Sequence, residues 1–381
     1  MRRWSVAFLW FAVAACSEPA PTSVTDTQTT SDSRDLDVAS ENDASSLEGL
    51  AWDLVDTGPY RVGYRTLTFS YDAVDHDEPR DIKLSIWYPT EDSDGVAASY
   101  LGLLDDELSF QDASLAPSVY GDTYPVHIHS HGHQGFAGST NFMMRHFASH
   151  GWVVAAPDHT GNTLVDNLDP RPPWMYTVRP ADISAALDQL ENLPEGDPLK
   201  DVLATDRVVM SGHSFGGYTA FVSAGASFNS EKVEQLCSDD PCADETIQAF
   251  SDGVREPRVI ASIPMAAGNR DMFGDAGYAT LECPVLYMTG SLDHPGVNEA
   301  VWESLEGTDS IRIDVAGGCH QLFGLGACHE IADEEGFGLV QGYALAFARH
   351  HVLGDTSVLD LLEGTASLSD KILYLSHQTP E

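Results

Sequence analysis

Apolar and polar positions alternate with two different periods from residue 60 onward. Short apolar runs typical of strands occur at residues 60–71, 81–89, 125–132, 152–158, 207–212, 258–265, 284–290 and 310–317. Helical spacing of apolar side chains occurs between or after them, at residues 140–151, 179–193, 215–226 and 334–354. Strands that alternate with helices predict an α/β fold, in which helices cover both faces of a mostly parallel sheet. The first two runs predict an antiparallel pair at an edge of that sheet.

Two insertions interrupt the alternation of strands and helices. Residues 98–122 precede the strand predicted at 125–132, and residues 227–256 follow the helix predicted at 215–226. Insertions at the carboxyl edge of such a sheet often cover or shape a pocket.

The first sixteen residues have the pattern of an export signal. Arg2 and Arg3 precede an apolar run that is too short to span a bilayer and that ends in two alanines and Cys16. Small residues before a cysteine resemble a bacterial lipoprotein signal, in which this cysteine is lipidated. We therefore expect residues 1–16 to be a lipoprotein signal peptide, and the chain to be exported and attached to a membrane only through Cys16. A plain secretory signal is the alternative.

Composition separates the next segment from the rest of the chain. Residues 17–50 are rich in Ser, Thr, Asp and Glu, which predicts a disordered acidic linker and leaves residues 51–381 as the α/β domain. The whole chain has 59 acidic and 19 basic residues, a formal charge of −40. Such a surface repels nucleic acid and anionic membranes, so we expect neither as a direct partner.

Five cysteines lie beyond the signal segment. Cys237 and Cys242 bracket a short polar loop and are predicted to form a disulfide. Cys319 and Cys328 bracket a second loop and are predicted to pair as well. Cys283 precedes an apolar strand and is expected to be a buried free thiol. Export favours this pattern over five reduced thiols.

A candidate nucleophile lies between a predicted strand and a predicted helix. The residues Gly212-His213-Ser214-Phe215-Gly216 match G-x-S-x-G, and this strand-to-helix setting is that of a nucleophile elbow. The glycines permit the sharp turn, which exposes the serine hydroxyl at the positive end of the helix. Ser214 is therefore the predicted nucleophile, and a purely structural Gly-Ser turn is the alternative.

A serine hydroxyl needs a base that takes its proton, and in this arrangement an acid and then a histidine follow along the chain. Asp293 follows the strand predicted at 284–290, and His320 follows the one at 310–317, so both are expected at the same sheet edge as Ser214. His320 is the predicted base, and Asp293 is predicted to orient its ring. The rival acids and bases are Asp271, Asp275, His294 and His329.

The negative oxygen of a tetrahedral intermediate needs two fixed hydrogen-bond donors. One is predicted to be the backbone N–H of Phe215, directly after the nucleophile. The other is predicted to be the backbone N–H of His133, in the loop after the strand at 125–132, where Gly132 allows a close approach of the backbone to the substrate.

Alternating histidines invite a metal interpretation. The four side chains could share one face of an extended chain: His127, His129, His131 and His133. We expect no metal there, because the chain must turn after His131 to form the predicted oxyanion loop. The sequence contains no glycine-rich nucleotide motif, and we expect no cofactor.

Several motifs together resemble a known group of enzymes. The segments are DIKLSIWYP, HSHGHQGF, FASHGWVVAAPDHTGNT, RPADISAALDQL and VVMSGHSFGGYTAF. They are similar to the bacterial relatives of platelet-activating-factor acetylhydrolase and dienelactone hydrolase and, more distantly, to the cutinases that hydrolyse PET. The resemblance spans residues 60–350 and implies an α/β-hydrolase fold and hydrolysis of carboxylic esters without a cofactor. By motif, Ser214, His320 and His133 match the nucleophile, the base and an oxyanion position.

This chain departs from those families at two positions. Dienelactone hydrolases proper have a cysteine where this chain has Ser214. Platelet-activating-factor acetylhydrolases place the acid after the strand that follows the nucleophile helix, where this chain has no aspartate before Asp271. The acid is therefore expected at Asp293 instead.

Aromatic and apolar residues near the predicted edge are expected to face the substrate. They are Phe136, Trp174, Met175, Tyr176 and Trp302. The expected substrates are short-chain lipid esters or polyesters of the PET or cutin type. Two other functions remain open, namely an amidase or peptidase that uses the same triad and a non-catalytic binding lipoprotein. The complete Ser214, Asp293 and His320 set argues against the second.

Overall fold

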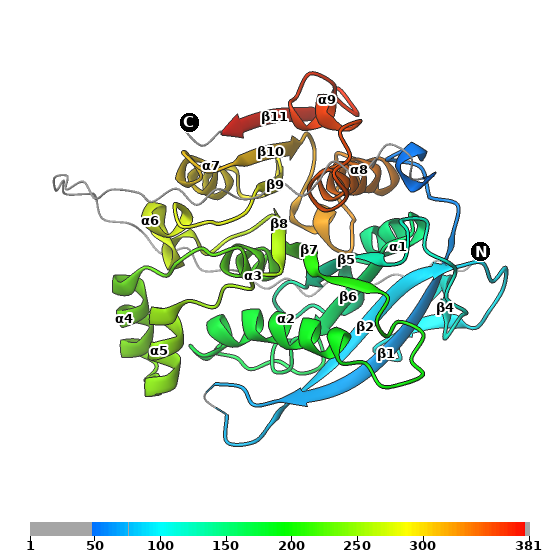
Figure 1. Cartoon of the computed structure of the whole chain (residues 1–381). Helices are drawn as coiled ribbons and strands as arrows, with labels where there is room; N and C mark the ends of the chain where they lie inside the picture. The colour runs from blue at the N-terminus through cyan, green and yellow to red at the C-terminus, as the bar shows by residue number, and fades with distance from the viewer. Residues whose placement is uncertain (1–47, 75, 378–381) are drawn as a thin grey trace. The chain divides into compact units, whose positions relative to one another are not determined.

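An eleven-stranded mixed sheet runs through the part of the chain that the computed structural model describes, residues 48–74 and 76–377 (Figure 1). Its strand order is β11-β10-β9-β8-β7-β5-β6-β2-β1-β4-β3. The strands are β1 (Arg61–Tyr71), β2 (Arg80–Thr90), β3 (Ala97–Tyr100), β4 (Leu104–Gln111), β5 (Tyr124–Ser130), β6 (Val153–Asp158), β7 (Leu203–His213), β8 (Val259–Met265), β9 (Val285–Gly290), β10 (Ser310–Val315) and β11 (Ile372–His377). The predicted α/β-hydrolase fold is confirmed.

Nine helices accompany the sheet in these described ranges. They are α1 (Asn141–Ser149), α2 (Met175–Glu191), α3 (Phe215–Ser223), α4 (Ser230–Asp239), α5 (Asp244–Asp252), α6 (Gly274–Tyr278), α7 (Pro295–Ser304), α8 (Asp333–Leu353) and α9 (Leu359–Leu362). Short 3-10 turns add η2 (Glu48–Ala51), η3 (Ala137–Thr140), η4 (Arg270–Met272) and η5 (His320–Phe323).

The central strands are buried on both faces, as their continuous apolar character predicts. In β6, Val154 and Ala156 pack with α1 and α8 on one face. Val153 and Ala155 alternate with them and pack on the other face, against α2 and α3. Parallel pairing joins β6, β5, β7, β8, β9 and β10. Their carboxyl ends therefore share one edge of the sheet.

The antiparallel pair of β1 and β2 is confirmed, but its predicted place at the sheet edge is wrong. On its other side β1 pairs with β4, and β3 then closes this end of the sheet. Residues 97–111, most of the first insertion, therefore extend the sheet (Figure 1). A buried acid explains why the apolar pattern did not reveal these strands. Asp106 accepts hydrogen bonds from Tyr100 at 2.6 Å and from Arg145 at 2.9 Å.

The second insertion forms α4 and α5. The predicted disulfide between Cys237 of α4 and Cys242 of the loop that follows it is confirmed. A cavity of about 490 Å³ separates these two helices from the end of α3 and from the segments that precede β8 and β9. Those segments lead into the amino ends of the strands. This cavity therefore lies toward the edge of the sheet opposite to the carboxyl ends of the parallel strands.

The remaining cysteines follow the prediction, except that Cys283 is half-buried and not fully buried. Cys319 and Cys328 form the second disulfide. Cys283 is a free, half-buried thiol, and burial raises its pKa to about 12, which disfavours the reactive thiolate. Two disulfides are consistent with export of the protein to an oxidising compartment.

The N-terminal part of the described chain is anchored to α8. The buried Arg349 donates hydrogen bonds to the carbonyl oxygens of Leu50 and Trp52, and it forms an ion pair with Asp355. Residues 48–50, which were predicted to end the linker, therefore contact the folded domain. The predicted signal peptide, Cys16 and residues 17–47 lie outside the described residues.

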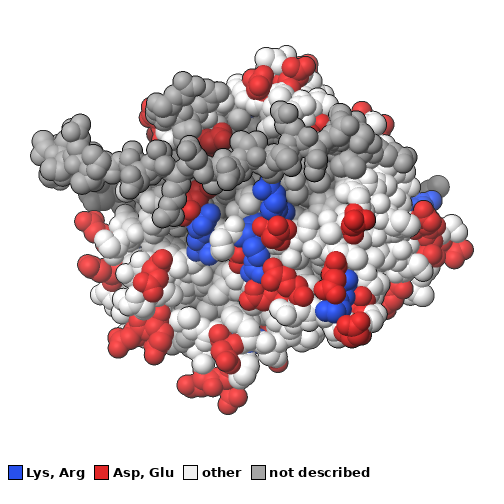
Figure 2. Space-filling view, in the orientation of Figure 1, with Lys and Arg blue, Asp and Glu red and all other residues white. Residues whose placement is uncertain are grey.

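Acidic side chains are spread over the face of the molecule shown in Figure 2, and the few basic side chains lie among them. This view agrees with the formal charge of −40. Within the described ranges, no helix has both the length and the hydropathy needed to cross a bilayer.

Buried neutral histidines are expected to make folding stability depend on pH. The unfolded chain binds protons on histidine below pH 6.5, about the ordinary pKa, whereas burial holds these side chains neutral in the fold. Burial lowers the pKa to about 3 or about 4 in six of them: His127, His146, His150, His159, His213 and His351. The neutral histidines contribute their full stabilisation above pH 6.5. This contribution is lost as the pH falls from 6.5 toward the pKa values that these histidines have in the folded protein.

We therefore expect the Tm to fall by about 5 °C between pH 7 and pH 6, as measured by scanning calorimetry. The measurement is made in 1 M NaCl, which screens repulsion among the surface carboxylates. A Tm that stays constant or rises over this interval would contradict the neutral state of these histidines.

Candidate active site

Ser214 occupies a strained turn between β7 and α3. Its φ of 56° and ψ of −114° lie outside the regions that ordinary residues adopt, at a cost of about 1–3 kcal/mol. Two glycines are sterically required around it. A Cβ on Gly216 would lie 1.8 Å from the carbonyl oxygen of Ser130, and one on Gly212 would lie 2.0 Å from that of Gly216. The geometry is that of a nucleophile elbow.

An aspartate and a histidine form a hydrogen-bonded pair at the same sheet edge. Asp293 lies three residues beyond β9, and His320 begins η5 after β10. His320 Nδ1 donates to Asp293 Oδ1 at 2.9 Å, and the side chains are 35% and 2% exposed respectively. This bond fixes the proton of the neutral ring on Nδ1, which leaves Nε2 free to accept a proton.

His320 is hydrogen-bonded to His213, the residue that precedes the predicted nucleophile. His213 Nε2 donates to the backbone carbonyl of His320 at 2.9 Å, and the two ring centroids are 4.8 Å apart. Burial lowers the pKa of His213 to about 3, so this ring stays neutral near pH 7. The disulfide of Cys319 and Cys328 constrains the segment that carries His320. These contacts place the histidine of the pair beside the elbow.

The rival acids and bases are exposed to solvent, and none of them forms the hydrogen-bonded pair of an aspartate and a histidine. The side chain of Asp275 is 75% exposed and binds Arg270 and Ser304. Asp271 and His329 are exposed. The exposed ring of His294 lies 6.3 Å from the ring of His320, but it is His320 that Asp293 binds.

The predicted oxyanion loop lies against the elbow. A Cβ added to Gly132 would lie 3.4 Å from Cβ of Ser214. The carbonyl of Gly132 accepts hydrogen bonds from His131 Nδ1 at 2.7 Å and from the N–H of Gly135 at 3.0 Å. In a trans peptide, the N–H of one residue points opposite to the carbonyl of the residue before it. The two hydrogen bonds that hold the carbonyl of Gly132 therefore also fix the direction of the N–H of His133.

The side chain of His133 is held from a second loop. Its Nδ1 accepts from Asn162 Nδ2 at 2.7 Å, and its ring centroid lies 6.4 Å from that of Phe215. Partial burial and the positive charge of Arg171 lower the pKa of His133. The two predicted oxyanion residues, His133 and Phe215, are therefore neighbours in space.

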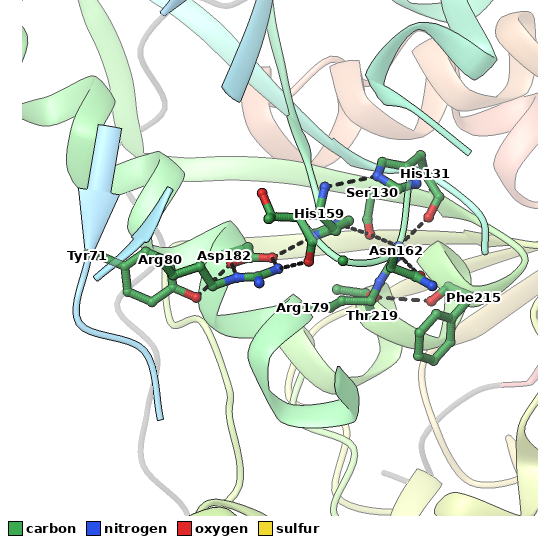
Figure 3. Close-up of polar contacts among 12 residues, drawn as sticks. Tyr71, Arg80, Ser130, His131, His159, Asn162, Arg179, Asp182, Phe215 and Thr219 are labelled. Carbon is green, nitrogen blue, oxygen red and sulfur yellow. Dashed lines mark hydrogen bonds and ion pairs between the residues drawn. The ribbon is translucent and has the colours of Figure 1, made fainter. Parts of the chain in front are cut away.

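A buried arginine braces the whole loop (Figure 3). Arg179 in α2 donates to the carbonyl oxygen of His131, to Ser130 Oγ at 3.0 Å and to Asn162 Oδ1 at 2.7 Å. A fourth bond, from its Nε to Thr219 Oγ1 at 3.2 Å, links it to α3. One guanidinium thus connects the predicted oxyanion loop, the loop that carries Asn162 and α3.

An acid lies deeper in the same network. Asp182 accepts a bidentate pair of bonds from Arg80 at 2.7 and 2.9 Å, together with bonds from Tyr71 at 2.7 Å and His159 Nδ1 at 2.8 Å (Figure 3). Arg80 and these hydrogen bonds outweigh the effect of burial and lower the pKa of Asp182 to about 2. His159 Nε2 then accepts from Ser130 Oγ at 2.8 Å, so the chain of bonds reaches the loop.

Substitution of Arg179 by methionine is expected to destabilise the fold by about 3 kcal/mol, because buried acceptors then lose their donor. It should also lower kcat more than it raises KM, because the oxyanion loop is held less firmly. Urea unfolding and steady-state kinetics measure the two effects. An unfolding free energy equal to that of the wild type would contradict the bracing role.

The residues expected to face the substrate divide into two groups. Phe136, Met175 and Trp302 are buried and present no surface to a substrate in this structure. Phe136 packs on Tyr100 of β3, and Trp302 stacks on His377 of β11 at a centroid distance of 3.9 Å. All three side chains pack in the core. The apolar pattern of the sequence is the same for a side chain that packs in the core and for one that contacts a substrate, so it did not separate the two.

Of the other two candidates, Tyr176 is the one that contacts a residue of the elbow. Tyr176 packs edge-on against Phe215 at 5.4 Å and is largely buried. Trp174 is half-buried, and its ring lies 4.6 Å from that of His76 in the loop between β1 and β2.

The alternating histidines have separate roles. His127 Nε2 and His129 Nδ1 both bond to Ser211 Oγ, at 2.6 and 2.7 Å, inside the core. His131 and His133 belong to the predicted oxyanion loop. Among the described residues, no group of three or more His, Cys, Asp or Glu side chains has the arrangement of a metal site.

Sequence reasoning missed the residues that brace the loop, namely Arg80, Asn162, Arg179 and Asp182, and it missed Arg171, whose charge lowers the pKa of His133. A signal was present in the predicted helix at 179–193, where Arg179 and Asp182 are three residues apart and so lie on one helical face. An arginine and an aspartate in that arrangement are more often a solvated surface pair, so the pattern did not indicate burial.

This chain is similar to known proteins in sequence and in fold. Residues 114–264 match the protein family described as Chlorophyllase. Platelet-activating factor acetylhydrolase of Cavia porcellus is 27% identical over 42% of this chain and 50% of its own length, so the chain spans about half of that relative. The structure of a ferulic acid esterase from Streptomyces cinnamoneus superposes with a TM-score of 0.61 and 20% identity, and covers 86% of this chain and 99% of the esterase.

Proposed function

We propose that this chain, whose fold is that of the α/β-hydrolases, is a serine carboxylic ester hydrolase with a triad of Ser214, Asp293 and His320. One observation carries the proposal. A single sheet edge brings together a serine in a strained elbow, a histidine that donates to a buried aspartate at 2.9 Å and a glycine loop against the serine.

The geometry supports a two-step mechanism. His320 Nε2 takes the proton of Ser214 as the hydroxyl oxygen attacks the ester carbonyl, and Asp293 stabilises the imidazolium that forms. The negative oxygen of the tetrahedral intermediate accepts hydrogen bonds from the backbone N–H groups of Phe215 and His133. Collapse passes the proton from His320 to the departing alcohol and leaves an acyl group on Ser214.

The second step reverses these roles. Water attacks the acyl-Ser214 carbonyl while His320 takes a proton from the water, and the acid leaves as the proton returns to the serine. The residues of this chain perform every step, so the mechanism needs no cofactor.

The relatives support esters as the substrate class, because their names describe an acetylhydrolase and a ferulic acid esterase. We extend the proposal to short-chain lipid esters or polyesters of the PET or cutin type. The half-buried Trp174 and the ring of Tyr176 beside Phe215 are the aromatic surfaces available for such substrates.

We also propose that the enzyme works outside the cytoplasm, attached to a membrane by a lipid on Cys16. Two disulfides in the fold support export. Mass spectrometry of the membrane-extracted protein tests the anchor, since a Cys16→Ser variant should lose both the lipid mass and membrane attachment.

Hydrolysis of 4-nitrophenyl acetate, butyrate and octanoate, compared with the matching 4-nitroanilides, tests the proposed reaction. We expect turnover of the esters, with little or no turnover of the anilides. Faster cleavage of the anilides would support an amidase, and a folded protein that cleaves neither series would support a binding role instead.

A further inference from the structure

A positive charge lies beside the proposed oxyanion hole. Arg171 belongs to the loop between β6 and α2 and is half-buried. Its guanidinium carbon lies 4.0 Å from the centroid of the Phe215 ring and 5.0 Å from that of Tyr176. Phe215 follows Ser214 directly and carries a proposed oxyanion N–H, so the guanidinium rests on the aromatic wall of the reaction site.

This arginine lacks a carboxylate partner in a chain rich in carboxylates. Within the described ranges, Arg171 contacts aromatic rings but forms no ion pair and no hydrogen bond. The exposed Asp169, two residues away, does not pair with it. By contrast, ion pairs hold Arg65, Arg80, Arg145, Arg258, Arg312 and Arg349.

A second guanidinium reinforces the positive potential. Arg179 lies 4.7 Å from the centroid of the same Phe215 ring, and its hydrogen-bond partners in the loop are neutral oxygens. The lowered pKa of His133, to which Arg171 contributes, agrees with this local field. An anionic substrate group is repelled by a molecule of charge −40, yet here it meets Arg171, which no carboxylate among the described residues binds, with Arg179 near the same ring.

We propose that Arg171 is a specificity-determining residue that binds a carboxylate carried by the substrate. The preferred substrates are therefore half-esters of dicarboxylic acids, in which one end is the scissile ester and the other is a free carboxylate. This inference rests on the proposed esterase function. A guanidinium fork matches a carboxylate in a bidentate pair, and the half-buried position beside two rings strengthens that pair relative to one in open water.

The carboxylate lies away from the reacting carbonyl and does not change during the reaction. Its pair with Arg171 therefore stabilises the bound substrate and the transition state equally, which affects KM and leaves kcat nearly the same. If Arg171 instead stabilised the oxyanion, its loss would lower kcat for charged and neutral esters alike. The split between KM and kcat separates these two roles.

A matched pair of substrates tests the inference. Mono-4-nitrophenyl adipate carries the carboxylate, and 4-nitrophenyl heptanoate is a neutral ester of comparable length. The adipate chain is too long for its carboxylate to expel nitrophenol readily through a small ring. Kinetics at 0.15 M NaCl are compared for the wild type, Arg171→Gln, Arg171→Lys and the control Arg207→Gln. Arg207 is exposed on the amino-terminal half of β7, about 23 Å of extended strand before Ser214.

We expect Arg171→Gln to lower the adipate-to-heptanoate ratio of kcat/KM about tenfold, chiefly through a higher KM for the adipate. Arg171→Lys should retain part of the preference, because the charge remains without the fork. Arg207→Gln makes the same charge change and should leave the ratio as in the wild type.

Equal losses on both substrates, or an unchanged ratio, would overturn the inference and leave the esterase proposal intact. An equal drop in the ratio for Arg207→Gln would overturn it as well, because net charge alone would then explain the effect. Failure of the wild type to hydrolyse either ester would count against the esterase function itself.

Discussion

Replacement of Ser214 by alanine is expected to lower kcat for 4-nitrophenyl butyrate by about 10⁴-fold or more. The substitution removes the attacking oxygen, and neither the base nor the oxyanion donors can replace it. The elbow should stay folded, because serine and alanine meet similar steric limits at a φ of 56°. Steady-state kinetics and thermal unfolding of the purified variant measure both expectations.

A second serine provides the matched control. Ser223 lies at the other end of α3, and its buried hydroxyl has no hydrogen-bond partner among the described residues. Ser223→Ala should keep full activity and should not destabilise the fold, because no hydrogen bond is lost. If Ser214→Ala retained more than a few per cent of the wild-type rate, the nucleophile would have to be another residue.

Replacement of Asp293 by asparagine is expected to lower kcat by about 10³- to 10⁴-fold, with a small change in KM. The carboxylate accepts the Nδ1 proton of His320 at 2.9 Å. An amide of the same shape can present its NH₂ group to that nitrogen, which favours the tautomer that carries the proton on Nε2. The ring can then no longer accept the serine proton, and the imidazolium loses its counter-ion.

The rival acid Asp275 is the control for this prediction. Its carboxylate is 75% exposed and binds Arg270 and Ser304, away from His320. We expect Asp275→Asn to change kcat less than twofold, in the range of ordinary surface substitutions. A large loss in Asp275→Asn together with a small one in Asp293→Asn would reverse the assignment of the acid.

The residues that perform the proposed chemistry could be identified from the sequence because each lies in a local pattern. Ser214 lies in a glycine-framed turn whose geometry depends on its immediate neighbours. Asp293 and His320 each follow an apolar strand, and parallel strands end at one edge. These relations depend on order along the chain and on strand direction, both of which the apolar pattern records.

The bracing network and the sheet edges depend on contacts between distant segments, and the sequence pattern does not record those. Arg179 and Asp182 occur in a helix where charged residues usually face water, but here they meet Asn162, Ser130 and Arg80 from other segments. The strands β3, β4 and β11 were not expected, since they are short and partly exposed at the ends of the sheet. Phe136 and Trp302 satisfy the same apolar rule whether they line a pocket or fill a core.

Covalent labelling with a fluorophosphonate tests the central claim most directly. The reagent phosphonylates a serine that a histidine activates, and the adduct resembles the tetrahedral intermediate. We predict one adduct per chain, located on Ser214 by peptide mass mapping, with esterase activity lost in proportion to labelling. Full labelling of another residue, or full activity after Ser214 is labelled, would contradict an acyl-Ser214 mechanism.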